Sequence, residues 1–188
     1  MRVETAQRSR PYPGFSASGD LVVVRRDDEH VMLAVIDVLG HGPDAARVAK
    51  DAGECLMTLD LDADVETWMM QLHRGLHRSR GAAVGLGRLR GTELQLSVVG
   101  NIEVRSAGTR VGVVASPGIV GRRLRKLRSF SFSMSPGDRV AMHSDGLRHV
   151  ALSSTRDLDI ERACDRLLDE CAVPADDASI LLSDFHDA

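Results

Sequence analysis

Short apolar runs separated by polar or glycine-rich turns predict β-strands along much of the chain. The β-branched run at residues 21–24 and the apolar run at residues 31–36 flank an acidic turn at residues 27–29, which predicts a hairpin. Asp20 and Asp37 lie at the far ends of its two arms, so we expect the hairpin to bring their carboxylates together. Two like charges at that distance repel each other, and a cation between them removes the cost.

Three segments carry apolar residues at helical spacing. The first begins at Pro43, which suits a first helical turn, Asp64 is expected to cap the second, and the third is predicted over residues 157–172. Their apolar faces are Ala45, Val48, Ala49, Ala52, Cys55, Leu56 and Leu59; Val65, Trp68, Met69, Leu72 and Leu76; and Ile160, Ala163, Cys164, Leu167, Leu168 and Cys171.

Further strands are predicted on both sides of the third helix. They cover residues 81–88, 94–98, 102–104, 111–114, 130–134, 139–143 and 178–182. The resulting order is strands, two helices, many strands, one helix and one strand, which is not an alternating βαβ pattern. It favours an α+β fold in which helices cover the outer faces of antiparallel sheets.

Composition narrows the class of protein. With 188 residues, 43% of them hydrophobic, and a net charge of −3, the chain fits one soluble domain spanning residues 1–188. The charge balance and the scarcity of aromatic residues argue against nucleic-acid binding. No apolar run approaches the roughly 20 residues of a membrane span, and residues 1–10 lack the apolar stretch of a signal peptide. Three cysteines without a C-x-x-C pair indicate reduced thiols, so we expect a cytoplasmic protein. We also expect a monomer.

Four acidic positions share one local pattern, a carboxylate at a strand end beside a glycine or a second acid. They are Asp20, Asp37, Asp145 and the pair Asp176-Asp177. A single Asp beside a Gly is usually a turn residue, and it is the combination that points to a site. Carboxylate oxygens suit hard divalent cations such as Mg²⁺ or Mn²⁺ better than zinc.

The same positions lie in four ordered segments, and two further segments accompany them. The four are Ser18-Gly19-Asp20, Asp37-Val38-Leu39-Gly40-His41-Gly42, Ser144-Asp145-Gly146-Leu147 and Asp176-Asp177-Ala178-Ser179; the other two are Arg80-Gly81-Ala82-Ala83 and Val99-Gly100-Asn101-Ile102-Glu103. The four segments resemble the motifs of the metal-dependent type 2C protein phosphatases, in the version of the bacterial SpoIIE/RsbU branch. The other two, and the short length, are similar to the stand-alone RsbX-type phosphatases of that branch, which reset stressosomes.

This resemblance implies an α-β-β-α sandwich, compact and without a flap subdomain, with two Mn²⁺ or Mg²⁺ ions at one end of the sheets. Asp37 would bridge the ions, the carbonyl of Val38 would reach one of them, and Asp145 and Asp176 would hold the other, with Asp20 as a further or water-mediated ligand. The implied reaction is direct attack of the metal-bridging water on phosphoserine or phosphothreonine. The implied substrates are phosphorylated STAS-domain proteins of the RsbR and RsbS types.

The chain departs from the larger members of the family in three ways. His41 lies four residues after Asp37, where larger type 2C enzymes place a histidine two residues after the bridging Asp, so its role is unassigned. The segment between Gly121 and Ser144 leaves no room for a flap, and no ligand for a third metal is evident. The choice between Asp176 and Asp177 stays open, with the family pattern favouring Asp176.

Other interpretations carry their own signals. One alternative is a phosphatase whose substrate is a lone anti-anti-sigma factor, as for RsbU. Another is a catalytically silent module that binds a partner. A silent member is expected to lose one of Asp37, Asp145 or Asp176, and all three are present. His73 and His77 have zinc-like spacing but lack the glutamate of H-E-x-x-H, which favours a solvated helix face. The basic stretch at residues 122–128 is more typical of a solvated edge than of a contact surface, and nothing in the sequence places Arg80.

Overall fold

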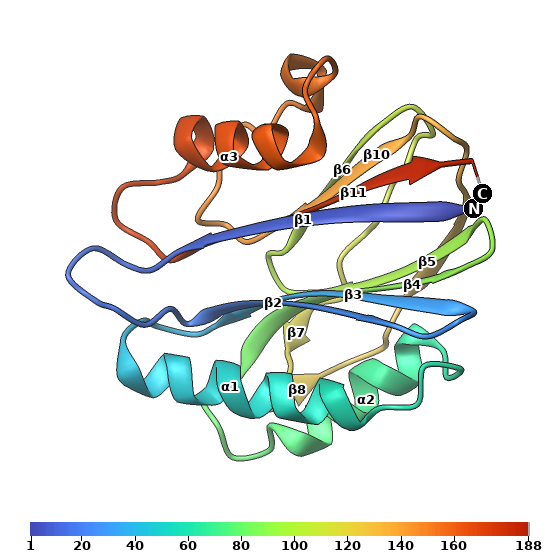
Figure 1. Cartoon of the computed structure of the whole chain (residues 1–188). Helices are drawn as coiled ribbons and strands as arrows, with labels where there is room; N and C mark the ends of the chain where they lie inside the picture. Colours follow the sequence, from blue (N-terminus) through green and yellow to red (C-terminus); the bar gives the residue numbers. More distant parts are fainter. Residues whose placement is uncertain (188) are drawn as a thin grey trace.

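In the computed structural model, which describes residues 1–187, two antiparallel sheets lie face to face and helices cover both outer sides (Figure 1). The first sheet has the strand order β1 (Arg2–Arg10), β11 (Ala178–His186), β10 (Arg139–His143) and β6 (Glu103–Ala107). The second has the order β2 (Asp20–Arg26), β3 (His30–Val38), β4 (Ala82–Arg90), β5 (Glu93–Val99) and β9 (Ser129–Ser133). A small separate ribbon pairs β7 (Gly118–Ile119) with β8 (Arg123–Leu124).

The helices divide between the two outer faces. The helices α1 (Pro43–Thr58) and α2 (Val65–Gly75) cover the second sheet, and α3 (Ile160–Cys171) covers the first (Figure 1). A short 3₁₀ helix, η1 (Leu152–Thr155), precedes α3. The predicted cap of α2 is confirmed, since the Asp64 carboxylate accepts a hydrogen bond of 2.7 Å from the N–H of Thr67.

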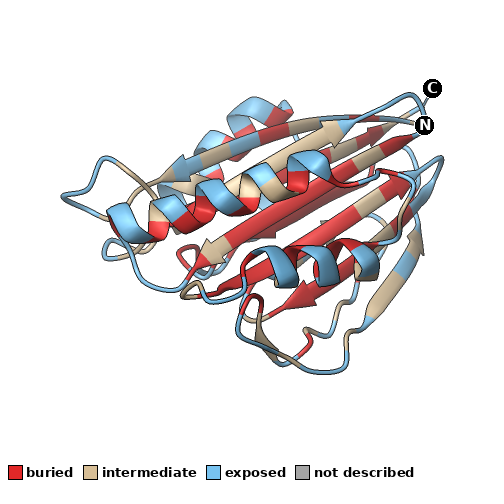
Figure 2. Cartoon of the chain, turned by 90° about the horizontal axis from the view of Figure 1, so that it is seen from below, coloured by how far each residue is buried: buried red, intermediate tan, exposed pale blue. Residues whose placement is uncertain are grey.

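Alternating burial along β3 explains the layers. Met32, Ala34 and Ile36 face the helices, whereas Leu33 and Val35 face the other sheet, because successive side chains of a strand point to opposite faces. Buried residues therefore run along the strands and the inner sides of the helices, and exposed residues lie on the outer sides (Figure 2).

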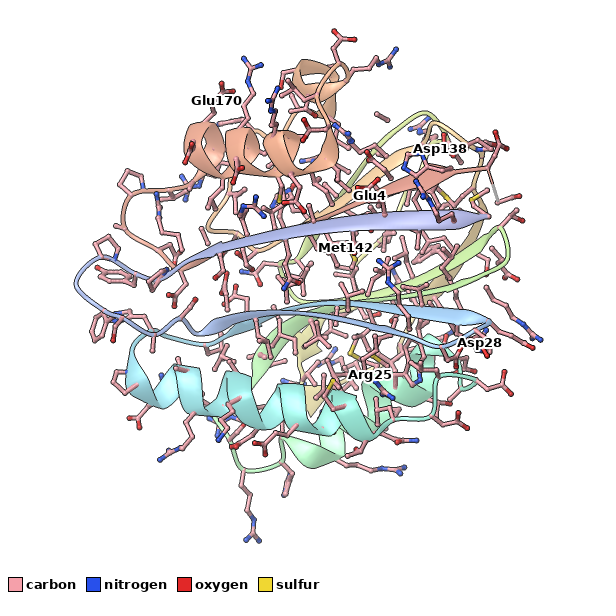
Figure 3. All side chains as sticks on the ribbon, viewed as in Figure 1. Glu4, Arg25, Asp28, Asp138, Met142 and Glu170 are labelled. Carbon is pink, nitrogen blue, oxygen red and sulfur yellow. The ribbon has the colours of Figure 1, made fainter. Side chains whose placement is uncertain are left out.

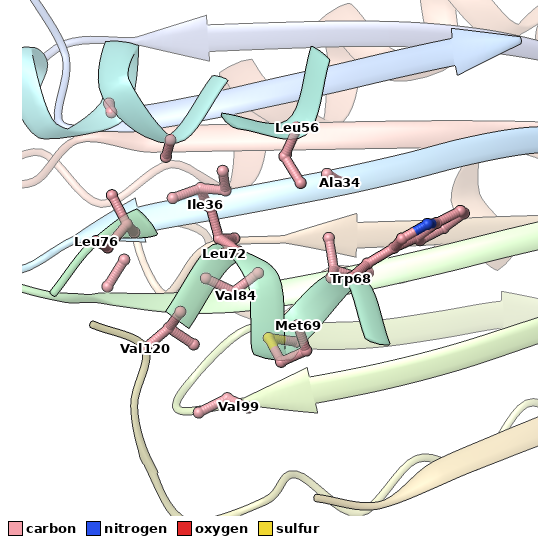
Figure 4. Close-up of a cluster of buried hydrophobic side chains, with 14 of the residues drawn as sticks. Ala34, Ile36, Leu56, Trp68, Met69, Leu72, Leu76, Val84, Val99 and Val120 are labelled. Carbon is pink, nitrogen blue, oxygen red and sulfur yellow. The ribbon is translucent and has the colours of Figure 1, made fainter. Parts of the chain in front are cut away.

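Three apolar layers result. One lies between the second sheet and the helices α1 and α2, and its side chains are seen in Figure 4. Another lies between the two sheets, where Met142 is seen in Figure 3. The last lies between the first sheet and α3. All three cysteines are free, and no helix among residues 1–187 has the length and apolarity to cross a membrane.

The predicted α+β sandwich without a flap is confirmed, one strand was not predicted and two details of the prediction are wrong. Residues 1–10 hold a strand, β1, which the sequence hid because only Val3 and Ala6 are apolar and buried in it; it pairs along its whole length with β11. Residues 111–114 form no strand. The helix predicted over 157–172 is shorter, since Asp159 accepts a hydrogen bond of 2.9 Å from the N–H of Arg162 and caps α3 there.

Replacing Phe185 with alanine tests the layer between the sheets. Its side chain is 0% exposed there, so its removal is expected to destabilise the protein by about 3–5 kcal/mol, measured by urea denaturation. Val114→Ala is the control, because this side chain is 55% exposed. A loss for Phe185→Ala as small as that of the control would contradict this assignment of the core.

Candidate functional site

The four predicted acidic positions gather at one end of the sandwich, where the β1–β2 connection and the start of α1 lie (Figure 1, left). Asp20, the first residue of β2, is paired directly with Asp37 near the end of β3. Asp145 follows β10, and Asp176 lies just before β11. Burial, together with the charges of Asp20, Asp145 and Asp176, raises the pKa of Asp37 to about 8. The predicted convergence of Asp20 and Asp37 through the hairpin is confirmed.

Asp20 is fixed by two buried serines that the sequence analysis did not single out. The Ser144 hydroxyl donates a hydrogen bond of 2.6 Å to the Asp20 carboxylate and accepts one of 3.0 Å from the N–H of Ser179. Burial raises the pKa of Asp20 to about 7, and the hydrogen bonds from the two serines oppose that rise. Asp20 is 6% exposed, so its position is set from inside the protein.

Asp145 is exposed and is oriented by an amide. The side-chain N–H of Asn101, in the turn after β5, donates a hydrogen bond of 2.5 Å to the Asp145 carboxylate. The next residue, Gly146, packs against the backbone just before β11. A Cβ built on Gly146 would fall 1.8 Å from the carbonyl oxygen of Asp177. Only glycine allows the two acidic segments to lie this close together.

Asp176 and Asp177 have different surroundings. The Asp177 carboxylate is buried and accepts hydrogen bonds from the N–H of Tyr12 at 2.7 Å, from the Ser18 hydroxyl at 3.1 Å and from the N–H of Gly19 at 3.0 Å. Asp176 is only half-buried, and burial together with the charge of Asp145 raises its pKa. Asp177 therefore anchors the loop before β2, and Asp176 is the one left available for a ligand.

Val38 ends β3 beside Asp37. Its N–H donates a hydrogen bond of 3.1 Å to the carbonyl of Gly19, which ties the start of β2 to the end of β3. Gly40 and Gly42 follow with φ angles of 84° and 79°, in the left-handed region that favours glycine. The chain thus turns sharply between the acidic strand end and α1.

His41 lies in an aromatic cluster that the sequence analysis missed. Its ring stacks on Tyr12 with centroids 4.2 Å apart and an angle of 18° between planes, and Phe15 is 5.1 Å away. Burial and the charge of Asp145 raise the pKa of Asp176, and a positive charge on His41 opposes this rise, which places the imidazole near the acidic centre. Because Asp177 anchors the loop that carries Tyr12 and Phe15, it also sets the position of this cluster.

The structure also places Arg80, His73 and His77, whose roles the sequence left open. The Arg80 guanidinium donates a hydrogen bond of 3.1 Å to the carbonyl of Leu39 and lies 3.8 Å from the Asp44 carboxylate, which places it beside the glycine turn. His73 does not form the solvated face that was expected, because its Nδ1 accepts a hydrogen bond of 2.9 Å from the N–H of Gly121. His77 is exposed, as expected.

The donor chemistry of the acidic centre fits hard divalent cations. Asp20, Asp37 and Asp176 all have raised pKa values, and neighbouring carboxylates contribute to each rise. A cation would remove this repulsion, and oxygen donors are those that Mg²⁺ and Mn²⁺ prefer. Among residues 1–187, no three acidic, His or Cys side chains already have the spacing of a closed metal cage, so a cation would have to draw these carboxylates together.

Comparison with known proteins gives one family. The profile of Stage II sporulation protein E (SpoIIE) matches residues 27–187. No curated protein matches the sequence.

Three solved structures illustrate the similarity of fold. A protein described in work on the bacterial stressosome, a modular system adapted to control secondary messenger signalling, is 28% identical with a TM-score of 0.90, and the match covers 97% of this chain and 100% of that one. RsbX in complex with magnesium is 19% identical with a TM-score of 0.83, covering 97% and 94% of the two chains. The structure of the type 2C phosphatase domain and a regulatory fragment of SpoIIE from Bacillus subtilis is 20% identical with a TM-score of 0.78, covering 98% and 64%.

The raised pKa values predict a pH-dependent stability. With divalent cations removed by EDTA, the melting temperature should fall by several degrees as the pH rises from about 4 to about 8. In this window the folded protein binds more protons than the unfolded chain, because the pKa values of Asp20 and Asp37 are about 7 and about 8 instead of 3.8. Asp37→Asn should flatten the fall, and added Mn²⁺ should raise the melting temperature more at pH 8 than at pH 5. Identical pH profiles for the wild type and Asp37→Asn would contradict this account.

Gly146→Ala tests the close approach of the two acidic segments. The new methyl group would overlap the carbonyl of Asp177, so Asp145 and Asp176 should be pushed apart and Mn²⁺ affinity should fall by at least about tenfold in calorimetric titration. Gly91→Ala is the matched control, since a Cβ there meets nothing within 4 Å, although its φ of 58° adds some strain. Equal Mn²⁺ affinities of the two variants would show that the contact is unimportant.

Proposed function

The chain belongs to the SpoIIE family, within the type 2C protein serine/threonine phosphatases, and from this premise we propose that it is an RsbX-type enzyme that needs Mn²⁺ or Mg²⁺ and hydrolyses phosphoserine and phosphothreonine in stressosome proteins. The observation that carries the proposal is the gathering of Asp20, Asp37, Asp145 and Asp176 at one end of the sheets, where their charges raise the pKa of Asp37. A protein that used these residues only for packing would gain nothing from this repulsion.

Each acidic residue has a distinct part in this proposal. Asp37, central among the four charges, would be a ligand shared by two cations, and the adjacent carbonyl of Val38 would be a ligand of one of them. Asp145 and Asp176 would hold the other, and Asp20 would contribute from the buried side as a further or water-mediated ligand. Bound there, divalent cations would supply Lewis acidity for phosphate-ester hydrolysis by water.

The remaining residues position these carboxylates. Ser144 keeps Asp20 in one orientation, and Asn101 does the same for Asp145 at the exposed side, where a phosphorylated side chain can enter. Holding the ligands before substrate arrives lowers the cost of ordering them during the reaction.

The substrates we propose are phosphorylated STAS-domain proteins of the RsbR and RsbS types. Support comes from the similarity to a protein of the bacterial stressosome and to RsbX. We further propose that residues 1–188 act as one catalytic domain and as a monomer, in the reducing environment of the cytoplasm that three free cysteines favour.

Hydrolysis of p-nitrophenyl phosphate tests the reaction. Wild-type protein should be active with Mn²⁺ and inactive in EDTA, and Asp37→Asn should lose at least about 100-fold in kcat, because it removes the bridging carboxylate. Asp28→Asn is the control, since this exposed Asp lies in the turn at the other end of the same hairpin (Figure 3). Turnover without metal, or full activity of Asp37→Asn, would refute the mechanism.

A side-by-side assay tests the substrate. We expect kcat/KM to be higher for phosphorylated RsbR-type and RsbS-type proteins than for a phosphorylated RsbV-type anti-anti-sigma factor, measured by phosphate release at equal concentrations. Equal rates on both kinds of protein would remove the RsbX-type assignment and leave the phosphatase. No rate on either, with p-nitrophenyl phosphate still hydrolysed, would exclude both substrates.

A further inference from the structure

A group of cationic side chains lies along α2 and, through Arg122, reaches the backbone of Gly81 near the Asp37 end of β3. It comes from two segments, the end of α2 with its following loop and the region around the β7–β8 ribbon. We call it the basic surface, and it consists of the exposed residues Arg74, Arg78, Arg122, Arg123, Arg125 and Lys126.

Contacts between the two segments hold these charges together. The N–H of Gly121 donates a hydrogen bond to His73, and the Arg122 guanidinium donates one of 3.4 Å to the carbonyl of Ser79. A surface hollow is lined by both Arg74 and Arg125. Arg74 and Arg125, about 50 positions apart in the sequence, therefore belong to one surface.

Apolar side chains anchor the segment around the β7–β8 ribbon to the core. Val120 is buried in the layer beneath α1 and α2, and Leu124 and Leu127 pack against the same layer. Four of the six cations, Arg122, Arg123, Arg125 and Lys126, lie between these anchors in the sequence and are left on the outside. Their positions are thus set by the fold and need less ordering when a partner binds.

The cations of the basic surface have no acidic partners among residues 1–187. Some arginines elsewhere are paired, as Arg8, Arg88 and Arg139 are with Asp165, Asp62 and Asp184. Asp64 and Glu66 line the same hollow, but they accept hydrogen bonds from Thr67 and Ser129 and form no ion pair with the basic surface. In a protein of net charge −3, this local positive excess is electrostatically complementary to an anionic partner.

The segment that carries the basic surface also borders the acidic centre on two sides. Val120 forms a bridge with Ala82, which is paired with Val38 next to Asp37. On the other side, the N–H of Gly100 donates to the carbonyl of Ser116, and the next residue, Asn101, holds Asp145. This segment therefore connects the basic surface to the acidic centre.

We propose that the basic surface binds an acidic stretch of the same phosphoprotein whose phosphorylated residue enters the acidic centre. This rests on the proposed function and narrows its substrate class to phosphoproteins with carboxylates beside the phosphorylated Ser or Thr. Adjacency to the centre favours such a protein over a membrane, and the lack of interleaved aromatics in residues 122–128 disfavours nucleic acid.

Two pairs of synthetic peptides test the proposal. In the first pair, a phosphoserine is flanked on both sides either by glutamates or by glutamines, and kcat/KM is measured for each peptide with Mn²⁺. The second pair has serine in place of phosphoserine and a fluorescent label, and the affinity of each peptide is measured by fluorescence anisotropy. The glutamate peptide should be favoured by at least about tenfold in both measurements at low salt, and the advantage should shrink as salt screens the charges. The variant Arg123→Gln, Arg125→Gln, Lys126→Gln should lose most of the advantage while its p-nitrophenyl phosphate turnover stays unchanged.

The matched control is Arg105→Gln, Arg162→Gln, Arg166→Gln, which makes the same change of net charge on the β6 and α3 side and should keep the preference. Equal affinity for both peptides in the wild type, or an undiminished preference in the basic-surface variant, would overturn the proposal. A further outcome is that phosphatidylserine vesicles or duplex DNA displace the glutamate peptide at lower concentrations than the unlabelled peptide does. That result would assign the basic surface to a different partner and would also overturn the proposal. A retained preference without p-nitrophenyl phosphate turnover would support acidic docking and refute only the proposed function.

Discussion

The pairing of Asp20 with Asp37 across the β2–β3 hairpin is the constraint around which this end of the protein is built. Like charges directly opposite each other on neighbouring strands are destabilising. The rest of the hairpin enforces the pairing, because Leu21 faces Ile36 and Val22 faces Val35 in the same register. A slip of one residue would relieve the two carboxylates but would turn every apolar side chain of β3 to the wrong layer. Apolar burial therefore holds an unfavourable electrostatic arrangement in place.

The surrounding residues keep this arrangement from relaxing. A buried carboxylate can escape repulsion by turning away or by taking up a proton, and Ser144 restrains the first of these for Asp20. The hydrogen bonds from Ser144 and Ser179 also favour the charged form, although burial still raises the pKa of Asp20. The Asp177 carboxylate, in contrast, accepts hydrogen bonds from three donors, which stabilise it in its buried position. Adjacent residues of the same type thus do opposite things, one anchoring a loop and the other facing the centre.

The sequence was sufficient for the parts of the fold that depend on apolar periodicity. The hairpin, the three helices and the α+β order follow from it, because each buries a continuous apolar face. It failed for β1, whose polar side chains suit an edge strand with little burial and leave no alternating signal. It also failed for the long-range contacts of the site, such as Tyr12 on His41 and Asn101 on Asp145. These depend on loops that only the assembled sheets bring together, and no local pattern encodes them.

Acidic and basic side chains are clustered in separate regions of this protein, although its net charge is only −3. The acidic centre and the basic surface are neighbours, and without bound cations their fields partly cancel for an approaching phosphoprotein. If two divalent cations bind as we propose, they would neutralise the carboxylates and leave the positive side chains around residues 122–126 dominant on that face. An acidic substrate would then be attracted chiefly to the metal-loaded protein, so that substrate binding and metal binding reinforce each other without any change of shape.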